Sequence, residues 1–147
     1  MREQVSKAAL LLIGAGLLAL GTGCGKSKIS ECNALIEVIN KGVQSLEKGQ
    51  KAGADPTGAA DLKAMAEAMD KVAADAALVE LTLPELQKFS GEYQAMAKEV
   101  SRAARDMATA AEAKDSDKIN VAQAAMEKAV KQEDPLVDGI NKFCQAP

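Results

Sequence analysis

The stretch TLPELQKFSGEYQAMAKEVSRAARDMATAAEA, residues 82–113, holds the longest regular pattern in this chain of 147 residues. Apolar residues recur in it at alternating spacings of three and four, which is the period of one buried stripe on an α-helix. The stripe consists of Leu86, Phe89, Tyr93, Met96, Val100, Ala103, Met107 and Ala110. We therefore predict a long helix over residues 83–113, with Thr82 as its N-cap and Glu85 completing a capping box.

Two segments before this stretch show the same period. Residues 30–48, with Ser30 as the predicted N-cap, carry the stripe Cys32, Ile36, Ile39, Val43 and Leu46. Residues 57–79 carry the stripe Leu62, Met65, Met69, Val72, Ala76 and Val79. Residues 49–56 contain two glycines and a proline, and they form the longest predicted loop between helices.

A fourth helical segment follows the turn at residues 114–117, where Asp115 or Ser116 is the predicted N-cap. Its stripe is Ile119, Ala122, Met126, Ala129 and Val130, continued by Val137, Ile140 and Cys144. Pro135 interrupts this segment, so the helix either kinks there or restarts with Asp134 as its cap.

Sustained spacings of three and four mean that each helix buries a narrow seam, and short connections make consecutive helices antiparallel. The composition agrees, because the chain has 29 alanines and 2% aromatic residues, and strand formers are scarce. The predicted fold is all-α: an antiparallel up-down-up-down four-helix bundle over residues 29–147, following an N-terminal signal peptide.

Missing residue types exclude several kinds of function. The chain has no histidine, which rules out Ser-His-Asp and Cys-His catalysis, a histidine-ligated haem and most transition-metal sites. Its formal net charge of −3 argues against a nucleic-acid partner. Phosphate-binding loops, dinucleotide-binding motifs and zinc-type cysteine spacings do not occur in the sequence. We therefore predict no catalytic residues, no metal and no cofactor.

The N-terminus has the pattern of an export signal. Arg2 and Lys7 make its first residues basic, residues 8–20 are a purely apolar run, and small residues follow before Cys24. This run is too short to cross a bilayer comfortably, since about 20 residues are needed. A buried core helix is the other interpretation, but the run lacks the polar face that such a helix would show.

The segment Gly21-Thr22-Gly23-Cys24 resembles the lipobox of bacterial lipoproteins, in which small residues precede an obligatory cysteine. Thr22, Gly23 and Cys24 match the motif, and Gly21 stands where leucine is usual. The resemblance implies that signal peptidase II removes residues 1–23 and that the Cys24 sulfur receives a diacylglyceryl group. Cleavage after Gly23 by the ordinary signal peptidase is the competing interpretation.

The same resemblance implies a localisation. Residues 24–28 would form a lipidated tether that holds the bundle at a membrane, facing the periplasm. Gly25 is not the aspartate that retains many lipoproteins of this class in the inner membrane, so the outer membrane is favoured over the inner one. In a cell with a single membrane, the bundle would lie on its extracytoplasmic face.

Three cysteines are present, so lipidation of Cys24 leaves the even pair Cys32 and Cys144. Cys32 begins the stripe of the first helix, and Cys144 ends the stripe of the last. In an antiparallel bundle these two positions lie at the same end, and an exported protein can keep a disulfide. We predict a Cys32–Cys144 disulfide, with two separate buried thiols as the alternative.

Several seam residues are weak candidates for chemistry. Glu133 could be a buried acid or a cation ligand, although a phase reset at Pro135 would turn it to water. Tyr93 could bind a ligand through its hydroxyl or belong to the core. The seam methionines could bind a soft metal, but we favour a core-filling role for them. They are Met65, Met69, Met96, Met107 and Met126.

Unequal helix lengths suggest a place for a partner. The second hairpin is longer than the first, so its excess should project beyond the loop at residues 49–56 as a two-helix tip. Small apolar residues exposed there would suit a partner helix. The candidate partner-binding residues are Met107, Ala110, Ala111, Ala122 and Met126. Alternatively, the loop folds over the tip and covers it.

Three hypotheses about function follow from these observations. The favoured one is a non-catalytic lipoprotein with a structural or protein-interaction role, held at a membrane by its lipid and contacting another envelope protein. The second is a small-ligand-binding or sensing bundle in the periplasm, with a pocket between helices. The third is an enzyme that uses only carboxylates and Tyr93.

Overall fold

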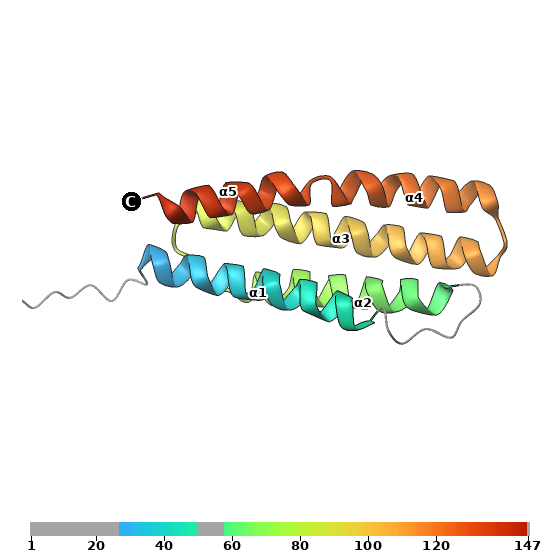
Figure 1. Cartoon of the computed structure of the whole chain (residues 1–147), viewed down its shortest axis with the longest axis horizontal. Helices are drawn as coiled ribbons and strands as arrows, with labels where there is room; N and C mark the ends of the chain where they lie inside the picture. Colours follow the sequence, from blue (N-terminus) through green and yellow to red (C-terminus); the bar gives the residue numbers. More distant parts are fainter. Residues whose placement is uncertain (1–26, 50–57, 147) are drawn as a thin grey trace, which may run out of the picture.

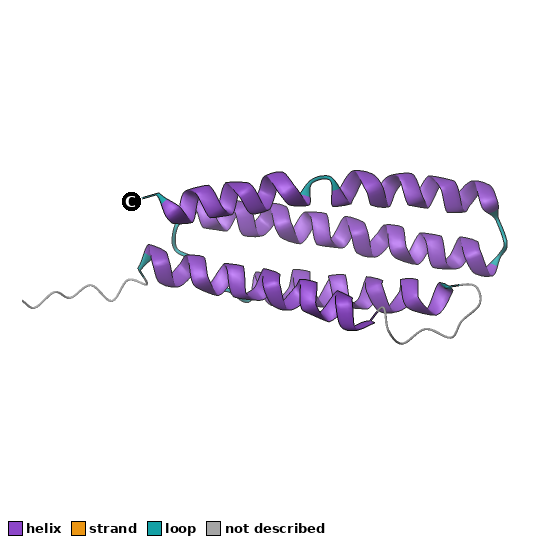
Figure 2. Cartoon of the chain, viewed as in Figure 1, coloured by secondary structure: helices purple, strands orange, loops and turns teal. Residues whose placement is uncertain are grey.

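The computed structural model describes residues 27–49 and 58–146, without the side chains of residues 45–49. These residues form α1 (Lys28–Gly49), α2 (Ala59–Ala77), α3 (Pro84–Glu112), α4 (Ser116–Val130) and α5 (Glu133–Gln145). Because α4 and α5 follow one another along one line, the helices form four antiparallel rods (Figure 1). Figure 2 shows helices joined by loops, with no strand among the described residues. The predicted all-α four-helix bundle is confirmed.

Some predictions concern residues outside this description. The signal peptide at residues 1–23, the lipidation site Cys24 and nearly all of the loop at residues 49–56 lie outside the described residues. The same is true of Thr57, the predicted start of the second helix. These predictions therefore stay predictions.

The bundle is elongated and has two different ends (Figure 1). We call one the bridged end: it holds the start of α1, the connection of residues 78–83 between α2 and α3, and the end of α5. We call the other the far end: it holds the start of α2, the end of α3 and the start of α4.

The helix α3 is the centre of the assembly, since it packs against α2 on one side and against α4 and α5 on another. Its predicted stripe is buried or half-buried throughout. A second stripe, shifted by one residue, is buried as well: Ser90, Ala97, Ser101, Ala104 and Ala108. Ser90 faces α2, because its hydroxyl donates a hydrogen bond to the Ala76 carbonyl oxygen at 3.2 Å. Because this second stripe consists of serines and alanines, it does not stand out in the sequence as a stripe of large apolar residues.

The helix α1 buries part of the predicted stripe, since Cys32 and Ile39 are 2% and 6% exposed, but its buried face is rotated. Leu35 is fully buried, whereas Ile36 is half-buried and Val43 is 39% exposed. Gly42 explains the difference, because a Cβ at this position would lie 2.5 Å from Cγ2 of Val72 in α2. The α1 backbone therefore packs closely on α2 at Gly42, and the buried face turns toward Leu35.

The predicted starts of the first two helices are shifted. Ser30 is not the N-cap of α1, because the helix begins at Lys28 and the Ser27 hydroxyl accepts a hydrogen bond from the Ser30 backbone N–H at 3.2 Å. The helix α2 begins at Ala59, after Gly58, whose φ of 69° lies in the left-handed region. Gly58 makes this entry possible, since residues with a Cβ rarely adopt that conformation.

The fourth rod is divided by a restart of the helix, which was one of the two predicted alternatives. The helix α4 begins after Asp115, whose carboxylate accepts a hydrogen bond from the Lys118 backbone N–H at 3.1 Å, as predicted. The helix α5 begins at Glu133, so Asp134 is not its cap. Pro135 falls in the first turn, where its missing N–H removes no hydrogen bond from the helix.

The two-helix tip is shorter than predicted, because α2 extends alongside α3 toward the far end (Figure 1). Lys63, in the second turn of α2, pairs with Glu112, the last residue of α3, at 2.5 Å. About half of the extra length of α3 lies at the bridged end, where Ser90 is level with Ala76: six residues of α3 precede Ser90, whereas one residue of α2 follows Ala76. The helix α1 stops short of the far end (Figure 1).

Candidate anchored end and interaction groove

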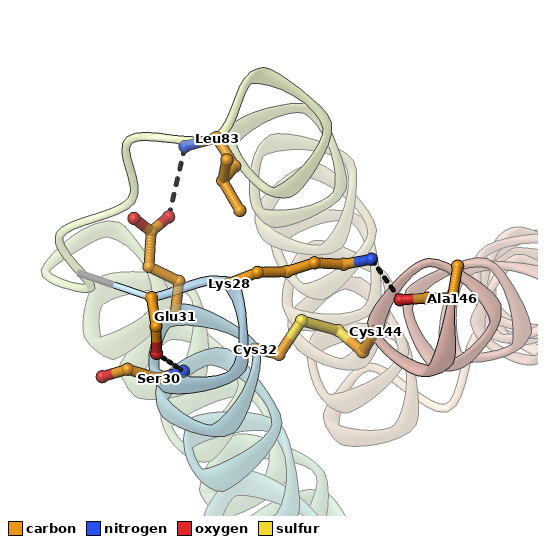
Figure 3. The surroundings of a disulfide bond; sticks show 8 residues. Lys28, Ser30, Glu31, Cys32, Leu83, Cys144 and Ala146 are labelled. Atoms are coloured by element: carbon orange, nitrogen blue, oxygen red, sulfur yellow. Dashed lines mark hydrogen bonds between the residues drawn. A yellow bond between two sulfur atoms is a disulfide. The ribbon is translucent and has the colours of Figure 1, made fainter. Parts of the chain in front are cut away.

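A disulfide joins Cys32 of α1 to Cys144 of α5 at the bridged end, as predicted (Figure 3). The two Cα atoms are 5.8 Å apart, within the usual range of about 4.4–6.8 Å. The bond connects residues 112 positions apart, so it closes almost the whole described chain into one loop. Cys32 is 2% exposed, which makes the bond part of the core.

Glu31, directly before Cys32, is a buried carboxylate that the sequence reasoning missed. Its side chain is 0% exposed. One carboxylate oxygen accepts hydrogen bonds from the backbone N–H groups of Thr82 and Leu83, at 2.8 and 3.2 Å. Figure 3 shows the bond from Leu83. The other oxygen accepts a hydrogen bond from the Thr82 hydroxyl at 2.5 Å. A carboxylate from α1 therefore lies at the positive, N-terminal end of α3.

The predicted capping box of α3 is wrong for the same reason. Leu83, not Thr82, occupies the N-cap position, and it has no side-chain oxygen with which to accept a hydrogen bond. Glu31 supplies that oxygen from another helix, and Glu85 takes no part in the cap. No local signal could have revealed this role of Glu31, because the cap depends on the contact between α1 and residues 82–83.

Lys28 adds a second tie, beside the disulfide, between the start of α1 and the end of α5. Its ammonium group donates a hydrogen bond to the Ala146 carbonyl oxygen at 2.6 Å (Figure 3). The same group lies 4.6 Å from the centroid of the Phe143 ring, a cation–π distance. Phe143 in turn contacts Phe89 of α3, with ring centroids 6.4 Å apart. Ser27, the first described residue, therefore directly precedes a helix start that is held by the disulfide and by the Lys28 contacts.

At the far end, the predicted partner-binding residues are less exposed than expected. Ala110 and Ala122 are 2% and 4% exposed, so the exposed face predicted at these two positions is wrong. The reason is that α4 packs against α3 through alanines, which allow a close approach. Met107, Ala111 and Met126 are half-buried.

A groove with a volume of about 450 Å³ lies between α3 and α4 at the far end. Four of its lining residues are alanines, and Val121 beside them is 72% exposed. The lining comprises Asp106, Thr109, Ala110, Ala113, Asp117, Lys118, Val121, Ala122 and Ala125. A smaller groove of about 220 Å³ continues it along the same helices, since both include Asp106 and Ala125. We call this continuous feature the α3/α4 groove.

A second concave surface, of about 550 Å³, lies between α1 and α5. Its apolar part comes from Ile39, Val43 and Val137, and its polar part includes three carboxylates of α5. Glu133 is one of these carboxylates. We predicted that it would point to water, but it is half-buried and lines this surface. Acidic residues in the first turn of α5 interact favourably with the helix dipole.

Tyr93 is 2% exposed and belongs to the core. Burial, and to a smaller extent the negative charge of Glu133, raises the pKa of Tyr93 to about 12. The phenol therefore stays protonated at neutral pH, and it cannot act there as a base.

Of the candidate soft-metal ligands, Met69 and Met96 lie within the core and Met65 packs against it. This arrangement is the one expected of core-filling methionines. Within residues 27–49 and 58–146, no cluster of three His, Cys, Asp or Glu residues is arranged to hold a metal ion.

In the same described ranges, no helix is both long and apolar enough to cross a membrane. The chain matches no protein-family model, and neither a curated protein nor a solved structure is similar enough to it to indicate a relationship.

Proposed function

We propose that this protein is a lipid-anchored protein of the bacterial cell envelope whose bundle has no catalytic role and binds another envelope protein. The observation that carries the proposal is the bridged end, where a disulfide and the Lys28 contacts secure the start of α1. Lys28 is the fourth residue after Cys24, the predicted lipidation site.

The anchor would determine the orientation of the bundle. At about 3.3–3.6 Å per residue, the tether from Cys24 to Lys28 spans at most about 13–14 Å. The bridged end would therefore lie close to the membrane, and the far end would point away from it. The 29 residues of α3 correspond to a rod of about 43 Å, at about 1.5 Å per residue.

The α3/α4 groove supports the interaction part of the proposal. It lies near the end of the molecule that is distant from Cys24, where a partner could reach it. The exposed alanines in its lining, Ala113 and Ala125, would let a partner helix approach closely, and Val121 offers an exposed apolar contact. Charged residues of both signs border it, including Asp106, Asp117 and Lys118.

Mass spectrometry of the protein isolated from membranes tests the anchor. We expect an N-terminal peptide that begins at Cys24 and carries a diacylglyceryl modification. The Cys24→Ser variant should be released from membranes or remain as the uncleaved precursor. Processed Cys24→Ser protein that still fractionates with membranes would overturn the proposal.

Site-specific photo-crosslinking in cells tests the partner. A photoreactive residue at Val121 should give a discrete crosslinked product with another envelope protein. Ala74 is a matched control, because it is exposed on α2 and lies outside the α3/α4 groove. Identical products from the two positions, or none from Val121, would contradict a partner at the groove.

A small-ligand-binding role is the second candidate, and the volume of the α3/α4 groove favours it. About 450 Å³ falls within the range of about 300–1,000 Å³ that is typical of ligand pockets. Such a ligand would be largely apolar. Chemical-shift changes confined to the residues around Val121 on addition of medium-chain fatty acids would support this candidate over a protein partner.

A further inference from the structure

The largest exposed aliphatic side chains are unevenly distributed over the described residues. Leu78 is 79% exposed, Val121 is 72% exposed and Ile29 is 68% exposed. Two of these three, Ile29 and Leu78, lie toward the bridged end. Neither belongs to the core cluster, so the fold itself gives no reason for a large apolar side chain at either position.

The topology brings these two positions to the same end of the molecule. Ile29 is the second residue of α1, and Leu78 directly follows the last residue of α2, which runs antiparallel to α1. The hydrogen bonds from Thr82 and Leu83 to Glu31 hold the connection of residues 78–83 against the first turn of α1. Ile29 and Leu78 are therefore carried by two segments that are fixed to each other.

The chain outside the description is attached at this end. Ser27 is the third residue after Cys24, a span of at most about 10–11 Å. We propose that Ile29 and Leu78 form a membrane-contacting surface, whose aliphatic side chains enter the interfacial layer of the bilayer that holds the Cys24 lipid. This inference rests on the lipid anchor of the proposed function.

Charge does not provide the attraction at this surface. The exposed ionisable residues toward the bridged end have both signs, with Lys142 near the end of α5 and Glu80 and Glu85 around the start of α3. Lys28 is already engaged with Ala146 and Phe143. The contact is therefore apolar, and it should be the same on zwitterionic and anionic bilayers.

The absence of tryptophan from the chain allows a direct test, since one introduced tryptophan is the only such fluorophore. The test uses the lipidated full protein with Ile29→Trp, Leu78→Trp or Val121→Trp, reconstituted into phosphatidylcholine vesicles with or without brominated acyl chains. All three positions are exposed, so the fold should tolerate each change. We expect a blue shift and a loss of emission to brominated lipid for Ile29→Trp and Leu78→Trp, and neither for Val121→Trp. Vesicles that contain phosphatidylglycerol should give the same result.

The outcomes separate this inference from the proposed function. Protein that does not float with the vesicles lacks the anchor, and both proposals are then wrong. If the variants float with the vesicles but Ile29→Trp and Leu78→Trp do not both lose emission, the lipid anchor stands and the membrane-contacting surface is wrong. Equal loss of emission for Val121→Trp also overturns it, because the bundle would then lie flat on the bilayer.

Discussion

The two ends of the bundle are held together by different kinds of interaction. At the bridged end, a disulfide, a buried carboxylate and a pair of phenylalanine rings connect α1, α3 and α5. Toward the far end, alanines pack against each other, and exposed ion pairs such as Lys63–Glu112 and Asp70–Arg105 connect α2 to α3. Specific, buried bonds hold the helices together at the bridged end. Contacts between small side chains and solvent-exposed ion pairs hold them together toward the far end.

This difference suits the two proposed roles of the ends. An end fixed beside a membrane benefits from bonds that define one geometry. An end that receives a partner helix benefits from small side chains, over which another backbone can pass closely. The predictions below test whether stability is in fact concentrated at the bridged end.

The largest effect should come from loss of the disulfide. Cys32→Ala should lower the free energy of unfolding of the oxidised protein by about 4–5 kcal/mol, because the unfolded chain is no longer closed into a long loop. Urea denaturation measures the change, and the double variant Cys32→Ala/Cys144→Ala is the control for the effect of a free thiol. Reduction of the unsubstituted protein should bring it close to the variant. Equal stability of oxidised and reduced protein would show that the disulfide contributes nothing.

Removal of the Glu31 charge should have the next largest effect. Glu31→Gln keeps the shape of the side chain but weakens three hydrogen bonds to residues 82–83, at a cost of about 2–3 kcal/mol. Glu85→Gln is the matched control, since Glu85 is exposed and takes no part in the cap of α3. Urea denaturation of both variants gives the comparison. If Glu85→Gln lost more stability than Glu31→Gln, this would favour the predicted capping box over a cap formed by Glu31.

A change inside the alanine packing of the far end should cost less. Ala110→Gln forces a longer side chain into the contact between α3 and α4, which should lower stability by about 1–3 kcal/mol. Val121→Gln changes an exposed side chain and should alter stability by less than about 0.5 kcal/mol. Thermal unfolding followed by circular dichroism measures both. An unchanged stability of Ala110→Gln would mean that α4 is held to α3 only loosely.

The smallest effect should come from the exposed ion pairs toward the far end. Hydrogen bonds from Arg105 and then from Ser101 hold the pKa of Asp70 below its usual value. This contribution to stability is present above the unfolded pKa of about 3.9 and is lost as the pH falls through the folded pKa. Asp70→Asn should therefore shift the urea midpoint only slightly at neutral pH, and added salt should remove the shift. A shift that persists in high salt would contradict a screened surface interaction.

Much of the fold could be predicted because repeated local signals specify it. Alternating spacings of three and four predict each helix independently, and Cys32 and Cys144 remain as a pair if Cys24 is lipidated. Short connections make consecutive helices antiparallel, which places the start of the first stripe and the end of the last stripe at the same end. An interruption near Pro135, as a kink or a restart, followed from its missing N–H, whereas the first residue of α5 did not.

The details that could not be predicted depend on contacts between helices. Glu31 caps α3 only because the fold brings α1 to residues 82–83, and no local pattern records that contact. Gly42 rotates the buried face of α1 toward Leu35 because Val72 lies opposite it. The burial of Ala110 follows from how α4 is placed along α3, which helix lengths alone do not determine.

The disulfide also decides how the bundle carries a mechanical load. Suppose that the chain before Ser27 is pulled while a partner holds the far end. The force enters through the first turn of α1, and at Cys32 it divides between α1 and α5, because the sulfur–sulfur bond joins these helices. Both helices are then loaded along their axes, side by side. To separate α1 from the rest of the bundle, the force must break many contacts between the helices simultaneously. The disulfide prevents α1 from detaching one contact after another.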